Sequence, residues 1–261
     1  MPRTVNRKNI HYPRGIIYVA PLDDDGVKEG LIDLGESIDF TTGLTIEEEK
    51  IPSGRGGASE TFDVIKTVLG ITFAFKLKEW NRENVNIAWL GDGFHTISQG
   101  SGYEPAKAIT VKELDRWYQT GYRNGTIISV EGLAPYTKEV DYKVREQTNR
   151  ETLIMPLSEG SISKDEELTV AIQYTAWSAI NIYPLTDVDR IFYMKFVGNP
   201  EYGPIMEPQW WKVALKCSAP LPLIGEGGHK EIEFEGEALS DRENHPTMPF
   251  GDFPITEDWP T

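Results

Sequence analysis

Residues 69–78 alternate between apolar side chains and small or charged ones, and a helix signal follows directly. The apolar members are Leu69, Ile71, Phe73, Phe75 and Leu77. A two-residue period predicts a strand with one face in a core. Trp80 ends the alternation, and Asn81 can then cap a helix that has Glu83 in its first turn and ends near Gly91. The chain is therefore expected to contain a β-domain with one packed helix.

Strand patterns continue on both sides of this segment. They occur at residues 15–21, 38–51, 59–67, 126–132, 138–144, 167–177, 189–197, 209–219 and 230–238. Together they predict a mainly β protein of about nine or ten strands. Residues 91–125 are rich in glycine and polar side chains, and we interpret them as an insertion containing one short helix. No internal repeat is visible.

Composition removes several classes of protein. The chain has 261 residues, of which 39% are hydrophobic, and this is enough to bury a sizeable core. It lacks an apolar run long enough to cross a membrane, and its first residues lack the apolar run of a signal peptide, so we expect a protein of the cytoplasm. The single cysteine, Cys217, excludes an internal disulfide framework and is expected to be a buried structural thiol.

The net charge is −15, which disfavours ordinary nucleic-acid binding because such a surface repels phosphate. The two ends have opposite signs. The basic N-terminal arm, residues 1–14, contains no acid, and its bases are Arg3, Arg7, Lys8 and Arg14. The acidic C-terminal tail, residues 241–261, has four prolines and no periodicity, and we expect it to be extended and to need a partner surface. The ends are either solvated tails or arms that contact neighbouring subunits.

One strand pattern near the C-terminus places four carboxylates on one face. These are Glu231, Glu233, Glu235 and Glu237, which alternate with Ile232 and Phe234. Like charges on one face are tolerated only where water screens them. Two interpretations stay open: a solvated outer face that blocks edge-to-edge aggregation, or a negative wall past which a polyanion moves without sticking.

A glycine- and serine-rich connection joins two strand patterns and predicts a long hairpin, residues 47–60, with a flexible, exposed tip. Its notable residues are Glu47, Glu48, Glu49, Ser53, Gly54, Arg55, Gly56 and Gly57. The stretch at 53–57 resembles a phosphate loop only superficially, because the ending GK[ST] and a following helix pattern are missing.

Residues that perform chemistry are sparse. The four histidines are dispersed and show no spacing typical of metal ligands. The turn at 23–26, sequence DDDG, lacks the rest of a calcium loop. No nucleophile, base and orienting group can be assembled from the sequence. We therefore expect no cofactor, no metal and no enzymatic activity.

The order of features between Gly43 and Gly91 resembles the major tail tube proteins of long-tailed (siphovirus-like) bacteriophages. The shared features are an acidic strand, a long hairpin, a returning alternating strand and a charged elbow, "EWNREN", before the helix. The early strand GIIYVAP at 15–21 fits as well. The resemblance covers roughly the first ninety residues; the remainder matches only in being strand-rich.

This resemblance implies a β-sandwich or β-barrel domain, residues 15–240, that forms hexameric rings stacked into a tail tube. Hairpin 47–60 would contact the adjoining ring, and phage DNA would pass through without specific binding. Such a protein is part of the virion tail, assembles in the host cytoplasm, and meets tape-measure, tail-tip and tail-terminator proteins. We expect the four glutamates to line the channel.

Two other classes remain open. A carbohydrate-binding β-sandwich would stack sugars on an exposed aromatic side chain, and of the adjacent Trp210 and Trp211 one must point away from the other. Another phage structural protein, a tail terminator or a capsid decoration protein, would share the lack of catalytic residues but would never form a long tube.

Overall fold

The computed structural model describes residues 14–52, 61–200, 204–224 and 228–256 and divides the chain into two compact units. The first unit comprises Met1–Gly93 and Ile182–Thr261, and the second comprises Phe94–Asn181. Within the described residues, several antiparallel sheets and one short helix, α1, form the protein. The predicted mainly β class with one packed helix is confirmed at this level.

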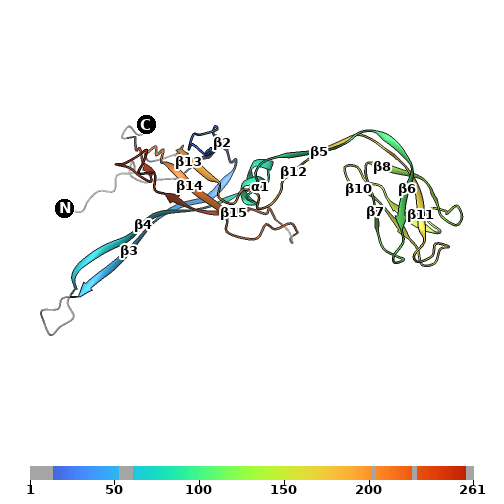
Figure 1. Cartoon of the computed structure of the whole chain (residues 1–261). Coiled ribbons are helices and arrows are strands. Elements are labelled where there is room, and N and C mark those ends of the chain that lie inside the picture. Colours follow the sequence, from blue (N-terminus) through green and yellow to red (C-terminus); the bar gives the residue numbers. More distant parts are fainter. Residues whose placement is uncertain (1–13, 53–60, 201–203, 225–227, 257–261) are drawn as a thin grey trace. The chain divides into compact units, whose positions relative to one another are not determined.

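One antiparallel sheet forms the first unit, with strand order β2-β1-β13-β14-β15-β4-β3 and with β16 also paired to β14 (Figure 1). The strand bounds are β1 (Gly15–Pro21), β2 (Ile32–Asp33), β3 (Ser37–Pro52), β4 (Thr61–Leu77), β13 (Ile191–Gly198), β14 (Gln209–Cys217), β15 (Ile232–Leu239) and β16 (Gly251–Asp252). The second and third strand patterns of the hairpin region, 59–67 and 69–78, are one continuous strand, β4.

The core of this unit lies on one face of the sheet. Phe75 and Phe234 are fully buried there and stack with ring centroids 5.2 Å apart. Phe40 on β3 stacks on Phe196 of β13 at 5.4 Å, although several strands separate β3 and β13 in the sheet order. The sheet therefore curls around its core and brings β3 near β13 without pairing the two strands.

Helix α1 (Arg82–Ala88) covers part of this core, and its ends follow the predicted signals. The side chain of Asn81 accepts the backbone N–H of Asn84 at 2.8 Å. At the other end, the N–H of Gly91 donates to the carbonyl of Asn86, and Leu90 adopts the left-handed conformation, with φ 51°. This pattern is a Schellman motif. A Cβ at position 91 would lie 2.3 Å from Asn86 Oδ1 and 2.9 Å from Ile182 Cγ2, so glycine permits the close packing there.

The second unit has a core of its own and three small antiparallel sheets. Their strands are β5 (His95–Gln99) with β12 (Trp177–Asn181); β6 (Gly102–Thr110), β11 (Glu167–Tyr174) and β8 (Gly125–Glu131); and β7 (Tyr118–Arg123), β10 (Glu151–Pro156) and β9 (Tyr142–Arg145). Its fully buried apolar residues include Val111, Ile154, Leu168, Val170 and Ile172. Each unit can therefore be described as a separate packed body.

The domain layout differs from the sequence expectation. The region expected to be one domain, 15–240, is divided between both units, and the expected insertion, 91–125, is only the beginning of a unit that continues to Asn181. The short helix expected there is absent from the described residues, which form strands and turns. The reason is long-range pairing: β6 binds β11, which lies far downstream, and a local pattern contains no information about that partner.

Candidate assembly surfaces

The four glutamates predicted to share a face lie at β15, opposite the core. Ile232, Phe234 and Ala238 of this strand are buried, while the glutamates between them are half-buried or exposed. Glu231 itself precedes the first residue of the strand. The predicted alternation is therefore confirmed, whereas a channel-facing role remains a proposal.

Lysines from the neighbouring strands neutralise two of these four carboxylates. Glu233 lies 3.2 Å from Lys76 of β4, and Glu235 lies 3.0 Å from Lys216 of β14. The hydrogen bond to Glu233 raises the pKa of Lys76. Glu237 instead faces Thr72 and Ala214 in the strand register. The outer face of β15 is thus a mixed ladder of charges with an acidic excess.

The hairpin predicted for residues 47–60 belongs to a longer ribbon. Because β15 pairs with β4 only from Ile71 to Leu77, residues 61–70 of β4 pair with β3 alone. Figure 1 shows this ribbon, formed by β3 and β4, extending away from the rest of the sheet. Ten residues of strand span about 30 Å at ~3.3 Å per residue. The first unit therefore presents a long two-stranded projection.

Apolar side chains are exposed along this ribbon. Ile46 on β3 is 46% exposed, and Ile65 on β4 is 47% exposed. Leu44, which is 77% exposed, lies at the base of the ribbon, opposite Ile71. Glu47, Glu48 and Glu49 follow Ile46 on β3. Exposed apolar groups beside a free strand edge are typical of surfaces that bind a partner.

Part of the predicted sites falls outside the described residues. This applies to the hairpin residues Ser53, Gly54, Arg55, Gly56 and Gly57 and to the arm residues Arg3, Arg7 and Lys8. Arg14 is described, and its carbonyl accepts the backbone N–H of Asn199 at 2.7 Å.

The two adjacent tryptophans point to opposite faces of the sheet, as expected. Trp210 is buried in the core, 3% exposed, whereas Trp211 stacks on His245 at 4.1 Å and donates its ring N–H to the carbonyl of Met248. A register shift on β14, opposite Phe192 and Met194, turns Trp210 inward with Val213. Cys217 is partly buried rather than fully buried, and its thiol donates to the carbonyl of Ala219.

The C-terminal tail differs from its predicted extended form up to residue 256. Strand β16 pairs with β14 at Gln209 and Trp210, and the segment before it covers Trp211. Asp241 is buried there and lies 2.9 Å from Lys212. The proline-rich sequence of this segment has no periodicity that would predict such packing, because the segment makes its contacts with β14 rather than within itself.

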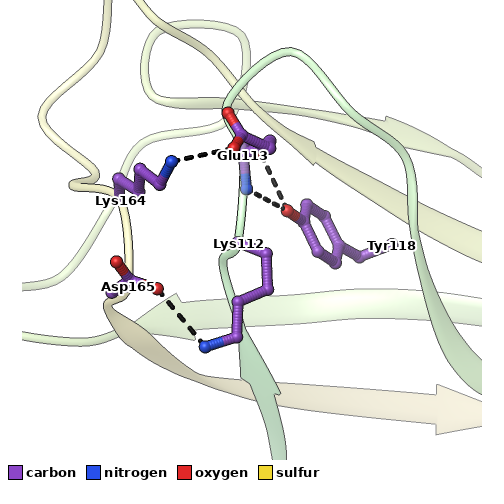
Figure 2. Close-up of polar contacts among 5 residues, drawn as sticks. All are labelled: Lys112, Glu113, Tyr118, Lys164 and Asp165. Carbon is purple, nitrogen blue, oxygen red and sulfur yellow. Dashed lines mark hydrogen bonds and ion pairs between the residues drawn. The ribbon is translucent and has the colours of Figure 1, made fainter.

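Polar contacts join the loop between β6 and β7 to the loop between β10 and β11 (Figure 2). Lys112 lies 3.3 Å from Asp165, and Lys164 lies 2.8 Å from Glu113. The hydroxyl of Tyr118 donates to the carbonyl of Glu113 and accepts its N–H, both at 2.7 Å. Each charge in Figure 2 faces an opposite charge, so the cluster fastens the loops and presents no activated acid, base or nucleophile.

A second polar cluster in this unit surrounds a buried carboxylate. Glu166 accepts the hydroxyl of Tyr136 and the backbone N–H groups of Ser163 and Leu133. Burial acts to raise the pKa of Glu166, but these three hydrogen bonds outweigh it and lower the pKa. Burial, followed by the hydrogen bond to Glu166, raises the pKa of Tyr136 to about 12. These contacts hold the loop after β8 in place.

Two other kinds of feature are absent from the described parts of the chain. Over the described parts of the chain, no three histidine, cysteine or acidic side chains are grouped as metal ligands would be. The same parts contain no helix with the length and apolar character needed to span a membrane.

Comparison with known proteins gives a family for the chain. No curated protein matches the sequence. The family described as "Protein of unknown function UCP028589" matches residues 11–254, which include nearly all the described parts of both units. The protein therefore belongs to this family.

Proposed function

We propose that this protein is a structural subunit of a phage tail tube, which forms hexameric rings that stack into a channel for DNA. In this proposal the protein acts in the virion tail, assembles in the host cytoplasm and catalyses no reaction. Its first partner is a second copy of itself, and tape-measure, tail-tip and tail-terminator proteins are the further partners.

The ribbon of β3 and β4 is the observation that most supports the proposal. Because residues 61–70 of β4 pair with β3 alone, the ribbon receives no support from its own sheet. Ile46 and Ile65 are exposed on it, so burial against another subunit would stabilise the assembly. A projecting ribbon with apolar side chains suits a contact from one ring to the next.

The distribution of charge fits a channel in which DNA must not stick. The second unit has twelve acidic and nine basic residues, a net charge of −3, so the first unit accounts for −12 of the total −15. Within the first unit we assign the acidic face of β15, with Glu231, Glu233, Glu235 and Glu237, to the channel. An acidic excess gives DNA no released counterions to drive adhesion.

The carbohydrate-binding alternative receives less support. An aromatic platform for sugar must be accessible, yet Trp210 is in the core and Trp211 is stacked on His245 of its own chain. Tail terminator and capsid decoration proteins remain neighbouring possibilities, and the number and stacking of the rings separate them from a tube protein.

Negative-stain electron microscopy of the purified protein over a concentration series tests the proposal. Hollow tubes or stacked six-fold rings are expected. Single rings that never stack would favour a terminator, and trimers would favour a decoration protein. Monomers that persist even after addition of tail-tip proteins would overturn the proposal.

A pair of matched variants tests the role of the ribbon. Ile46→Glu, on the unsupported part of β3, is expected to leave rings intact and to stop their stacking, because a charge replaces an apolar contact between rings. Leu133→Glu, at a leucine of the second unit that is 89% exposed, is the control and should leave stacking unchanged. Equal stacking by both variants would show that the ribbon does not form the contact between rings.

A further inference from the structure

A groove of about 930 Å³ lies between the beginning of β1 and the beginning of β3. Its apolar lining, which we call the floor, consists of Phe40, Phe196, Ile16 and Ile38. Ile16 is 40% exposed, so the floor is accessible from outside. The groove exists because the curled sheet brings these two strands together without pairing them. Its volume is sufficient for several side chains.

Acidic side chains also line the groove, and we call them the rim. They are Asp33, Glu36, Asp39 and Glu79, while Arg14 is the one base among the described residues that line the groove. Two contacts fix this rim: Glu79 accepts the backbone N–H of Glu36 at 3.0 Å, and Asp33 accepts that of Gly35 at 2.8 Å. The groove thus combines an apolar floor with a net negative rim, and it fits a segment that is both basic and partly apolar.

The backbone of β3 adds a further means of binding. β3 is the last strand of the described sheet, and its pairing is to β4 alone. Such an edge has backbone N–H and C=O groups that an extended peptide can pair with.

We propose that residues 1–13 of a second copy of this chain bind in the groove; the inference rests on the proposed assembly of copies. This segment contains Arg3, Arg7 and Lys8, no acid, and the apolar Val5 and Ile10. Its bases complement the acidic rim, and its apolar side chains complement the floor. A segment of thirteen residues is also long enough to leave its own unit and enter another, at up to ~3.3 Å per residue.

Arg14 joins the arm to β1 and continues the direction of that strand. The carbonyl of Arg14 accepts the N–H of Asn199, which continues the β1–β13 ladder past the pair Gly15 and Gly198. The chain therefore reaches β1 along the strand direction. Arg14 also lines the groove, so binding of the arm in its own groove is the alternative that disulfides within single chains would show.

A second acidic cleft, of about 840 Å³, serves as the control site. It is lined by Asp23, Asp24, Asp25, Asp187 and Asp189 among others, and its lining contains no aromatic side chain. Charge attraction alone would bring the basic arm to this cleft as readily as to the groove. The cleft offers the aliphatic Leu22 and Ile191, whereas the groove adds two aromatic rings, Phe40 and Phe196, for contact with Val5 and Ile10.

Disulfide trapping in full-length protein tests the inference. In a Cys217→Ser background, one copy with Val5→Cys and a size tag is mixed with an untagged copy with Ile16→Cys and oxidised. The yield of disulfide-linked heterodimer is expected to be at least about tenfold higher than the yield with an Asp24→Cys copy, which places the cysteine in the cleft. Glu36→Lys with Asp39→Lys in the groove copy should lower the yield about tenfold, and Arg7→Glu with Lys8→Glu in the arm copy should restore it.

The alternative results are distinguishable. Heterodimer yields that are equal for the groove and for the cleft would overturn the inference, as would a disulfide formed only within single chains that contain both Val5→Cys and Ile16→Cys. The same samples are imaged by electron microscopy. Tubes without the heterodimer would contradict the groove contact and support the proposed tube. The heterodimer without rings or tubes would support the groove contact and contradict the proposed function.

Discussion

Lys76 on β4 and Glu233 on β15 are directly opposite each other in the antiparallel register, and their Nζ and Oε1 atoms lie 3.2 Å apart. The pair is one step of a charge ladder on the outer face of the sheet, and Lys216 with Glu235 forms the next step. An acidic face organised in this way keeps part of its charge compensated within the subunit itself.

The ladder predicts different effects for two glutamates of one strand. Glu235→Gln should lower the free energy of unfolding by about 0.5 kcal/mol at low salt, because Lys216 loses its partner, and high salt should remove the difference. Glu237→Gln removes a carboxylate that faces Thr72 and Ala214 and should be neutral or slightly stabilising. Urea unfolding at two salt concentrations measures both. Equal losses in the two variants would contradict the ladder.

The hydrogen bond from Tyr136 to Glu166 predicts a local loss of stability. Tyr136→Phe leaves a buried carboxylate with one donor fewer and should cost about 1–2 kcal/mol. The loss should be confined to the second unit, where hydrogen exchange of residues 132–166 would accelerate. Tyr103→Phe, at a tyrosine that is 57% exposed, is the control and should change little.

The same pair predicts how stability depends on pH at the alkaline end. The pKa of Tyr136 rises from 10.0 to about 12 on folding, so between these values the unfolded chain loses a proton that the folded chain keeps. The stability contributed by this group is complete below pH 10 and is lost as pH rises toward 12. Thermal unfolding should show this fall in the natural protein, and Tyr136→Phe should lack it.

At acidic pH the stability of the protein is expected to change with pH in the opposite direction. The pKa of Glu166 is lower in the folded protein than its usual 4.5, so its carboxylate contributes stability that is present above that pH and is lost as pH falls through the folded pKa. Glu166→Gln should therefore be less stable at neutral pH and should lose less on acidification. The midpoint of chemical unfolding between pH 7 and pH 3 measures this. Parallel curves for the two proteins would contradict it.

The division into two cores predicts that each core can be destabilised separately. Phe75→Ala should cost about 3–5 kcal/mol in the first unit, and Ile172→Ala about 2–5 kcal/mol in the second, because both side chains are fully buried. Hydrogen exchange at increasing denaturant should show faster exchange only in the unit that contains the substitution. A joint loss of protection in both units would mean that they unfold together.

Gly251 predicts how firmly the C-terminal segment is attached. Its φ is 151°, and a Cβ there would lie 2.1 Å from the carbonyl oxygen of Gln209, so Gly251→Ala should detach β16 from β14. The fluorescence of Trp211 should then respond to added quencher. Gly100→Ala, at a site with open space around it, is the control and should have no such effect.

Local signals in the sequence predicted the local structures correctly. The cap at Asn81, the alternation in β4 and the glutamate face of β15 all depend on neighbours within a few residues, and each is found in the structure. A strand or helix end is determined by contacts that the sequence places close together.

Distant partners account for what the sequence did not predict. β6 pairs with β11, and β16 with β14, across long stretches of chain, so neither the second unit nor the packed C-terminal segment had a local signal. The groove between β1 and β3 was missed for the same reason, because Phe40 and Phe196 meet only when the sheet curls.

The chain enters and leaves the second unit through neighbouring strands. His95 of β5 and Asn181 of β12 are directly paired, so the two crossing points are strand partners. A connection of this kind lets the whole unit be replaced by a short turn or by a foreign domain whose ends lie close together. The strand pairing of the remaining sheet would stay unchanged. The site between Gly93 and Ile182 is therefore a natural position for displaying an engineered cargo.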